Sequence, residues 1–218
     1  MVMDRQKTGA LIAQMRKDRG LTQRELAEIA GRNIQGCSQN NVDADRDETI
    51  QRAKDAGVSK VFIPAIDMPS VSRVLAVCDH YPGYAYPMIG LHPEEVRADW
   101  QDVLKEMKPV LDANRDKVIA VGEVGLDYYW SREFEQLLAF GEQVRWSIEY
   151  RLPLMIHCRK GQNEMVRLLR RYEKELPGGV FHCFTGNEKE AAELLSFDRF
   201  VLGIGGVLTF KKSHLPEV

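Results

Sequence analysis

The sequence predicts an α/β fold built on a parallel sheet. From residue 43 onward, short apolar stretches alternate with helical patterns, an order typical of strands joined by crossover helices. Short apolar runs such as residues 118–121 favour strands that are covered on both faces. Six such units can be recognised in the 218 residues, whereas a closed barrel of this type has eight. We therefore expect a TIM-type (β/α)₈ barrel that is incomplete and preceded by a short helical segment.

The apolar stretches and the turn residues that bound them define the expected elements. Strands are predicted over residues 58–66, 84–91, 118–124, 152–158, 179–183 and 200–204. Helices are predicted over residues 45–56, 132–150 and 163–175.

The barrel is predicted to be incomplete at both ends. Residues 32–41, where a first strand is expected, are polar and interrupted by Gly36. The sequence stops at Val218, soon after the sixth strand. We expect an N-terminal segment over residues 1–41 and a barrel domain over residues 42–218. Unpaired sheet edges invite pairing with other chains, so self-association is expected.

Residues 1–41 follow a different pattern. Leu11, Ile12 and Met15 lie on one helical face, and a capping box over residues 22–25 opens a second helix. Residues 20–31 resemble the start of a Cro/repressor-type helix-turn-helix. Three interpretations stay open: a capping appendage, a fused remnant, or a DNA-binding regulator that uses residues 8–41. Fragments this small rarely fold alone, which favours the first two.

The composition is that of a globular protein. Hydrophobic residues make up 44% of the chain and charged residues 28%. The net charge of −2 excludes a protein dominated by nonspecific electrostatic binding of nucleic acid. We see no apolar run that approaches a membrane span of about 20 residues, and no apolar core of a signal peptide. The sequence therefore predicts a cytoplasmic protein without a membrane partner.

The cysteines are predicted to be reduced and buried. Cys37, Cys78, Cys158 and Cys183 lack the paired spacing of a metal finger. Cys158 and Cys183 each follow a histidine on an expected strand, so they should point to the opposite face from that histidine.

Three metal-ligating residue types end separate apolar stretches. Glu123, His157 and His182 follow residues 118–121, 154–156 and 179–181. In a (β/α)₈ barrel the C-terminal strand ends converge on the active site. One carboxylate and two imidazoles suit a divalent cation. The alternative for Glu123 is an ion pair with a Lys or Arg inside the barrel.

Five ordered motifs carry a family resemblance. They are Met-Ile-Gly-Leu-His-Pro at 88–93, Gly-Glu-Val-Gly-Leu-Asp at 122–127, Ile-His-Cys-Arg at 156–159, Phe-His-Cys-Phe-Thr-Gly at 181–186 and Gly-Ile-Gly-Gly-Val-Leu-Thr-Phe at 203–210. From about residue 43 to 218 the chain resembles the TatD family of metal-dependent deoxyribonucleases. The resemblance implies an amidohydrolase-type barrel that hydrolyses DNA phosphodiesters with one or two divalent cations such as Zn²⁺, Mg²⁺ or Mn²⁺. It also implies that Glu123 bridges two cations and that His157 and His182 complete the second site, which makes these three the catalytic and metal-binding candidates.

The sequence departs from this family at two places. The family's first strand ends in a His-x-His pair, which falls here near Ile34 and Gly36. The family's last strand supplies an Asp that binds the first cation and accepts a proton from water, and no residue here matches it. We therefore expect one cation and reduced nuclease activity. The rival interpretation is a non-catalytic metal- or nucleic-acid-binding relic.

Four further residues are candidates for substrate binding. His92 is placed to contact a phosphate or leaving group, with loop packing as the alternative. Asp127 is placed to orient a ligand histidine, or to cap a loop. Arg159 is expected to neutralise phosphate, and Tyr128, with Tyr129 and Trp130, to stack on a base or to pack at the rim. The expected substrate is single-stranded or 3'-ended DNA.

Overall fold

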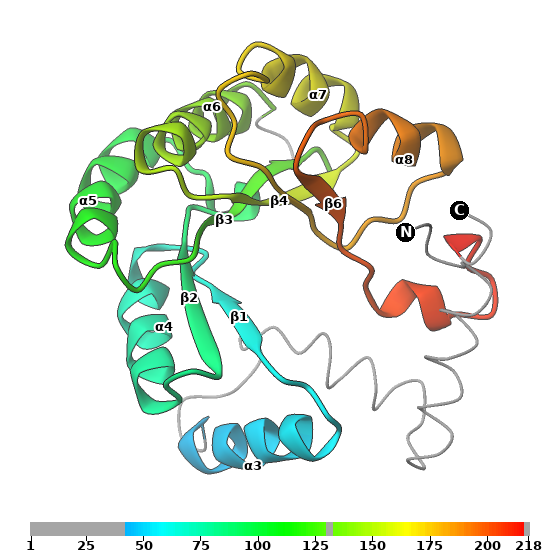
Figure 1. The fold of residues 1–218 in the computed structure, drawn as a ribbon. Helices are drawn as coiled ribbons and strands as arrows, with labels where there is room; N and C mark the ends of the chain where they lie inside the picture. Colours follow the sequence, from blue (N-terminus) through cyan, green and yellow to red (C-terminus); the bar gives the residue numbers. More distant parts are fainter. Residues whose placement is uncertain (1–41, 130–132, 216–218) are drawn as a thin grey trace. The chain divides into compact units, whose positions relative to one another are not determined.

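A parallel sheet of six strands is the frame of the larger part of the chain (Figure 1). The computed structural model describes residues 42–129 and 133–215. The strands are β1 (Val61–Pro64), β2 (Ala85–Ile89), β3 (Ala120–Asp127), β4 (Leu154–Arg159), β5 (Gly179–Phe181) and β6 (Phe200–Leu202). Each strand pairs in parallel with the next one in the sequence. This sheet confirms the predicted fold class.

Helices connect the strands and lie along one side of the sheet, as Figure 1 shows for α4 to α7. They are α4 (Met68–His80), α5 (Trp100–Ala113), α6 (Glu133–Tyr150) and α7 (Gln162–Arg170). Helix α4 packs on β1 and β2, and α6 packs on β3. A capping box begins α4, because Ser70 N–H donates to Asp67 Oδ1 at 2.8 Å and Asp67 N–H donates to Ser70 Oγ at 3.1 Å.

Large apolar side chains fill the space between the sheet and these helices. Strand residues Ile89, Val121 and Ile156 are fully buried. So are Met107 on α5 and Val144 on α6. Each side chain of this size contributes about 1.5–3 kcal/mol when it is buried. This core holds the strand ends in place, and the strand ends carry the predicted site residues.

The described residues form two compact units. The larger comprises Lys60–His182 and Ala192–Gly203, and it contains the whole sheet. The smaller unit includes α3 (Val42–Asp55) and the 3₁₀ helix η3 (Gly206–Thr209). Helix α3 ends at Asp55, and Gly57, whose φ of +83° favours glycine and whose N–H donates to Lys54 O at 2.8 Å, closes the turn that follows it.

The remaining short elements are the 3₁₀ helix η2 (Pro93–Glu95) and helix α8 (Glu188–Leu194). The side chain of Asn187 caps the start of α8, since its Oδ1 accepts from Lys189 N–H at 2.9 Å and Glu190 N–H at 3.1 Å. None of the helices within residues 42–129 and 133–215 has the length and hydropathy that a membrane crossing requires.

The open edges of the sheet agree with an incomplete barrel. Within the described part of the chain, β1 and β6 each pair with one neighbour. The predicted boundary at residues 41/42 lies at the limit of the described residues and stays a prediction. The helix-turn-helix resemblance of residues 20–31, the alternative DNA-binding role of residues 8–41 and the doubtful strand at residues 32–41 all lie outside the described residues.

The prediction for the cysteines was wrong in part. Cys78 is buried as expected, whereas Cys158 is only half-buried. Cys183 is exposed, because β5 ends at Phe181 and strand alternation no longer sets the direction of a side chain two residues later. The backbone at Cys183 has a φ of +48°, which confirms that the strand has ended before this residue.

Candidate active site

One carboxylate oxygen of Glu123 is the centre of the predicted site. Glu123 Oε1 lies 3.3 Å from His157 Nδ1, 3.8 Å from His182 Nε2 and 3.8 Å from His92 Nε2. The Glu123 side chain is only 8% exposed. It comes from β3, while the histidines lie on β4, directly after β5 and in the loop after β2. The structure thus brings all three histidines to Glu123, but His182, whose side chain is 41% exposed, is not part of the group of ligand atoms that lie within 4.8 Å of one another, whereas His92 is.

A β-bulge turns Glu123 toward these histidines. In the pairing of β3 with β4, Gly122 is opposite Met155 and Val124 is opposite Ile156, so Glu123 is an extra residue. Strict alternation along β3 would place Glu123 on the same face as Val121. The bulge changes this alternation and allows Glu123 and Asp127 to contact the same imidazole.

Gly125 makes the close approach of β3 to β4 possible. It lies opposite His157 in the strand pairing. Its φ is +136°, and a Cβ atom at this position would collide with the His157 carbonyl oxygen. No residue other than glycine fits here without moving the strand that carries His157.

Asp127 fixes the orientation of the His157 ring. Asp127 Oδ2 lies 2.9 Å from His157 Nε2, and Oδ1 accepts from Tyr129 N–H at 3.0 Å. A carboxylate accepts hydrogen bonds, so Nε2 of His157 carries the proton of this contact. The other ring nitrogen, Nδ1, then faces Glu123. This is the carboxylate–histidine arrangement that prepares an imidazole to bind a cation.

The pKa values of Glu123 and His157 shift in opposite directions. Burial lowers the pKa of His157, but its hydrogen bonds with Glu123 and Asp127 outweigh burial, so the net pKa is raised. Burial raises the pKa of Glu123, but the hydrogen bond with His157 and the charges of the neighbouring histidines outweigh it, so the net pKa is lowered. Without a cation, these two residues therefore favour a charged pair.

His92 has a different protonation pattern. Its Nδ1 accepts from Glu94 N–H at 3.1 Å at the start of η2, so the proton of the neutral ring is on Nε2. Burial lowers the pKa of His92 and outweighs the attraction of Glu123, which favours this neutral form. The ligand atoms of His92, Glu123 and His157 lie within 4.8 Å of one another. In this tautomer, however, Nε2 of His92 is a hydrogen-bond donor and has no free lone pair for a cation.

The rim of the site combines an exposed ring with two cations. Tyr129 is 52% exposed, with the Arg159 guanidinium 4.0 Å and the Lys160 ammonium 5.1 Å from its ring centroid. Arg159 Nη1 also lies 3.9 Å from Asp127 Oδ2. Trp130 lies outside the described residues.

Tyr128 has a different environment from Tyr129. Its side chain is half-buried, and a Cβ at Gly161 would lie 3.4 Å from its ring. Burial, with smaller effects of nearby acids, raises the pKa of Tyr128 to about 12. The sequence pointed to Tyr128 as the main base-stacking candidate, because a motif at a strand end does not show which of two adjacent tyrosines is exposed.

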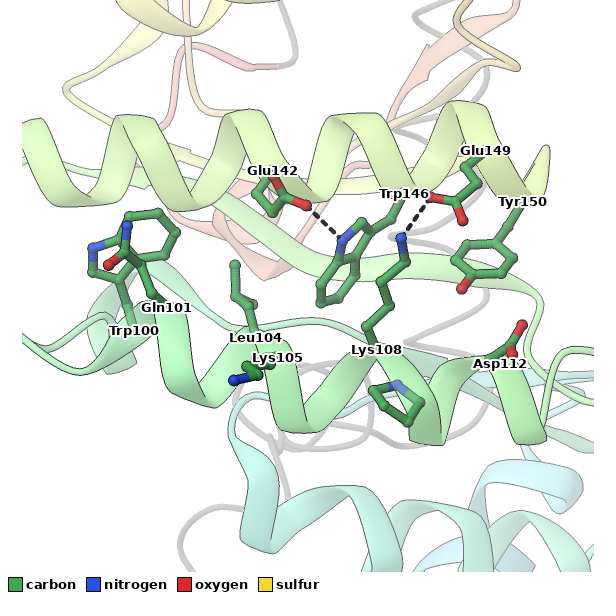
Figure 2. A pocket seen from close by; sticks show the side chains of 11 residues that line it. Trp100, Gln101, Leu104, Lys105, Lys108, Asp112, Glu142, Trp146, Glu149 and Tyr150 are labelled. Carbon is green, nitrogen blue, oxygen red and sulfur yellow. Dashed lines mark hydrogen bonds and ion pairs between the residues drawn. The ribbon is translucent and has the colours of Figure 1, made fainter.

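A separate groove of about 670 Å³ lies between α5 and α6 (Figure 2). It is lined by aromatic side chains, such as those of Trp146 and Tyr150, and by charged residues. Two pairs of its polar groups contact each other: Lys108 Nζ lies 2.7 Å from Glu149 Oε2, and Trp146 Nε1 donates to Glu142 Oε1 at 3.2 Å. The residues that line this groove include none of the predicted site residues.

A family model and several curated proteins match this chain. The family described as TatD related DNase matches residues 35–218. The uncharacterized metal-dependent hydrolase YabD of Bacillus subtilis (strain 168) is 32% identical over 177 residues, which are 80% of this chain and 68% of YabD. The 3'-5' ssDNA/RNA exonuclease TatD of Cronobacter sakazakii is 37% identical over 166 residues, 75% of this chain and 62% of that protein.

Solved structures show the same relationship. YJJV, a TatD homologue from Escherichia coli K12, aligns with a TM-score of 0.71 and 30% identity over 78% of this chain and 66% of that chain. A TatD family hydrolase from Entamoeba histolytica aligns with a TM-score of 0.65 and 28% identity over 73% of this chain and 56% of that chain. The chain thus matches only about two thirds of the length of these curated relatives. The family match over most of its residues nevertheless shows that the chain belongs to the TatD related DNase family.

Proposed function

We propose that this protein is a metal-dependent hydrolase that cleaves DNA phosphodiester bonds, with Glu123, His157 and His182 as ligands of one divalent cation. The observation that carries the proposal is the orientation of His157. Its Nε2 is held by Asp127 at 2.9 Å, so Nδ1 is directed at Glu123 Oε1, 3.3 Å away. One carboxylate and two imidazoles are a donor set that fits Zn²⁺ or Mn²⁺ and leaves open positions.

The bound cation would supply Lewis-acid chemistry at a phosphoryl oxygen and a lowered pKa for water. The chain's own residues would orient the substrate beside it. His92 is neutral, and its Nε2–H is available to donate to a phosphate oxygen or to the leaving group. Asp127 keeps His157 in one orientation and does not itself contact the substrate in this proposal.

Arg159 and Lys160 are proposed to neutralise the phosphates of the substrate, next to the base-stacking surface of Tyr129. An exposed tyrosine flanked by cations is suited to a single strand, whose bases are free to stack on an aromatic ring. The Cronobacter sakazakii relative is named a 3'-5' ssDNA/RNA exonuclease, which supports a single-stranded, 3'-ended substrate. The half-buried Tyr128 is proposed to support this surface from below.

We also propose that the chain self-associates through its sheet edges. Among the described strands, β1 and β6 have one paired side each. Exposed edges template pairing with further strands. Light scattering of the full chain tests this, and a monodisperse monomer at high concentration would contradict it.

The function is tested with the full chain after removal of metal by a chelator. We expect Mn²⁺ to restore cleavage of a 5'-labelled single-stranded oligonucleotide, with products that shorten from the 3' end. His157→Asn should lower kcat by at least about 100-fold, since it removes a proposed cation ligand together with its hydrogen bond to Asp127. His80→Asn is the matched control, because His80 lies on α4 outside the site. Wild-type chain that stays inactive with every divalent cation would overturn the proposal.

A further inference from the structure

Helix α6 carries two buried glutamines on the face toward the sheet. Gln136 and Gln143 are 2% and 1% exposed. They are seven residues apart, which is about two helical turns, so their side chains lie on the same stripe of the helix. Buried amides are retained where they meet specific partners.

Gln136 holds the main chain of Asp127. Its Oε1 accepts from Asp127 N–H at 2.8 Å, and its Nε2 donates to Asp127 C=O at 3.0 Å. The side-chain amide of Gln136 thus makes the two main-chain hydrogen bonds that a neighbouring strand would otherwise make to Asp127. The N–H of the next residue, Tyr128, donates to Arg159 O on β4, whereas the pairing of β3 with β2 has already ended at Val121.

Gln143 holds the main chain of Leu91 in the same way. Its Oε1 accepts from Leu91 N–H at 2.6 Å, and its Nε2 donates to Leu91 C=O at 3.2 Å. Leu91 directly precedes His92. His92 N–H in turn donates to Ile66 O at 2.9 Å, so the backbone on both sides of this peptide is held.

We propose that Gln136 and Gln143 are positioning residues that make α6 a common support for the two loops of the site. This inference rests on the proposed function. Through Asp127, Gln136 sets the orientation of the His157 ring, because Asp127 Oδ2 contacts His157 Nε2 at 2.9 Å. Through Leu91, Gln143 sets the position from which His92 faces Glu123. Helix α6 therefore fixes the distance between His157, a proposed cation ligand, and His92, a proposed donor to the substrate.

The test uses Gln136→Met and Gln143→Met, which keep the length of the side chain and remove its hydrogen bonds. For Gln143 these include a third one, from Nε2 to Ala139 C=O at 3.3 Å on the same helix. Ser147→Ala is the matched control on the same helix. Ser147 is fully buried and its Oγ donates to Leu152 C=O at 2.6 Å, at the other end of the sheet from the site. All three variants lose a buried hydrogen bond to the main chain, but only the glutamine variants lose one at the site.

Three measurements separate positioning from a merely structural role. Gln136→Met should weaken Mn²⁺ binding by about 10-fold in calorimetry, as loss of a ligand's outer support does. Gln143→Met should lower kcat on single-stranded DNA by about 10-fold with Mn²⁺ affinity unchanged, since it displaces the His92 donor that is proposed to contact the phosphate or the leaving group. Ser147→Ala should lower the Tm alone.

The inference is overturned if both glutamine variants behave like Ser147→Ala, with a lower Tm and unchanged Mn²⁺ affinity and kcat. If Gln136→Met does not fold, Gln136→Glu keeps the acceptor for Asp127 N–H and serves the same comparison. The nuclear magnetic resonance signal of the His157 ring proton is a readout that needs neither cation nor substrate. We expect a slowly exchanging Nε2–H in the metal-free wild type and its loss in Gln136→Met, so the inference can fail or stand independently of the nuclease activity.

Discussion

Asp127 Oδ2 and His157 Nε2 lie 2.9 Å apart at the ends of two adjacent strands. This contact decides which nitrogen of His157 is available for other partners. The carboxylate accepts the Nε2 proton, and Nδ1 faces Glu123 Oε1 at 3.3 Å. The relationship leads to predictions for cation binding, for stability and for the effect of pH.

The first prediction concerns the number of cations. Glu123, His157 and His182 supply three ligands for one ion, so elemental analysis should give at most about one tightly bound Zn²⁺ or Mn²⁺ per chain. Glu123→Gln should abolish tight binding, because the shared carboxylate is lost. Two equivalents bound in wild type and lost together in this variant would show that a further set of ligands had been overlooked.

The second prediction concerns the partner of His157. Asp127→Asn replaces an acceptor with an amide that can also donate, and it should weaken cation affinity by about 10–100-fold. Titration calorimetry measures this loss. Asp79→Asn is the control, since Asp79 forms an exposed ion pair with Lys117 at 2.7 Å and lies on α4. Equal affinities for the two variants would contradict an orienting role for Asp127.

The third prediction concerns Gly125. Gly125→Ala introduces a Cβ that collides with the His157 carbonyl oxygen at a φ of +136°, so we expect a loss of about 3 kcal/mol or more in the free energy of unfolding. Gly83→Ala isolates the backbone cost, because Gly83 also has a positive φ, +76°, but has no atom within 4 Å of an added Cβ. It should cost only about 1–2 kcal/mol. Urea unfolding measures the free energy of unfolding of both variants. Equal losses in the two variants would contradict the close approach of β3 to β4.

The fourth prediction concerns the pH dependence of the metal-free chain. The pKa of His157 is raised above 6.5, so its stabilising contribution is complete below that pH and is lost as pH rises through the folded value. The pKa of Glu123 is lowered below 4.5, so its contribution is complete above that pH and is lost as pH falls through the folded value. The charged pair therefore contributes most between about pH 4.5 and 6.5.

Urea unfolding in the presence of chelator measures this contribution as the difference between wild type and His157→Gln. The difference should be largest between about pH 4.5 and 6.5 and should shrink toward pH 9. A difference that grows steadily up to pH 9 would contradict the charged pair.

The fifth prediction concerns thiol reactivity. Burial and the neighbouring Asp79 raise the pKa of Cys78 to about 12, and the side chain is buried, so it should react with a thiol reagent only after unfolding. Cys183 is exposed and should react in the folded chain. Peptide mapping after brief labelling measures the reaction of Cys78 and of Cys183 separately. A Cys37→Ser background reduces the number of thiols that can react. Labelling of Cys78 at the rate of Cys183 would contradict its burial.

The existence and order of the strands could be predicted from the sequence, because both depend on local patterns, whereas several strand ends lie two or three residues from their predicted positions. Apolar runs bounded by turn residues predict strands whatever the rest of the chain does. A Glu or His at the end of such a run is therefore expected at the C-terminal edge of a parallel sheet; His182 directly follows β5, whereas His157 lies inside β4 and Glu123 lies in the middle of β3. Their roles as ligands stay a prediction that the experiments above test.

The tertiary structure decided what the local patterns leave open. Strict alternation does not foresee the bulge at Glu123, since an extra residue in one strand exists only relative to its partner. The same holds for the proton on His92, which depends on Glu94 N–H, and for the exposed Tyr129 beside the half-buried Tyr128. Gln136 and Gln143 read in the sequence as ordinary helix residues, and only their hydrogen bonds to Asp127 and Leu91 distinguish them. The physical reason is that the direction of a hydrogen bond depends on where distant segments meet, whereas the period of a strand depends only on its own residues.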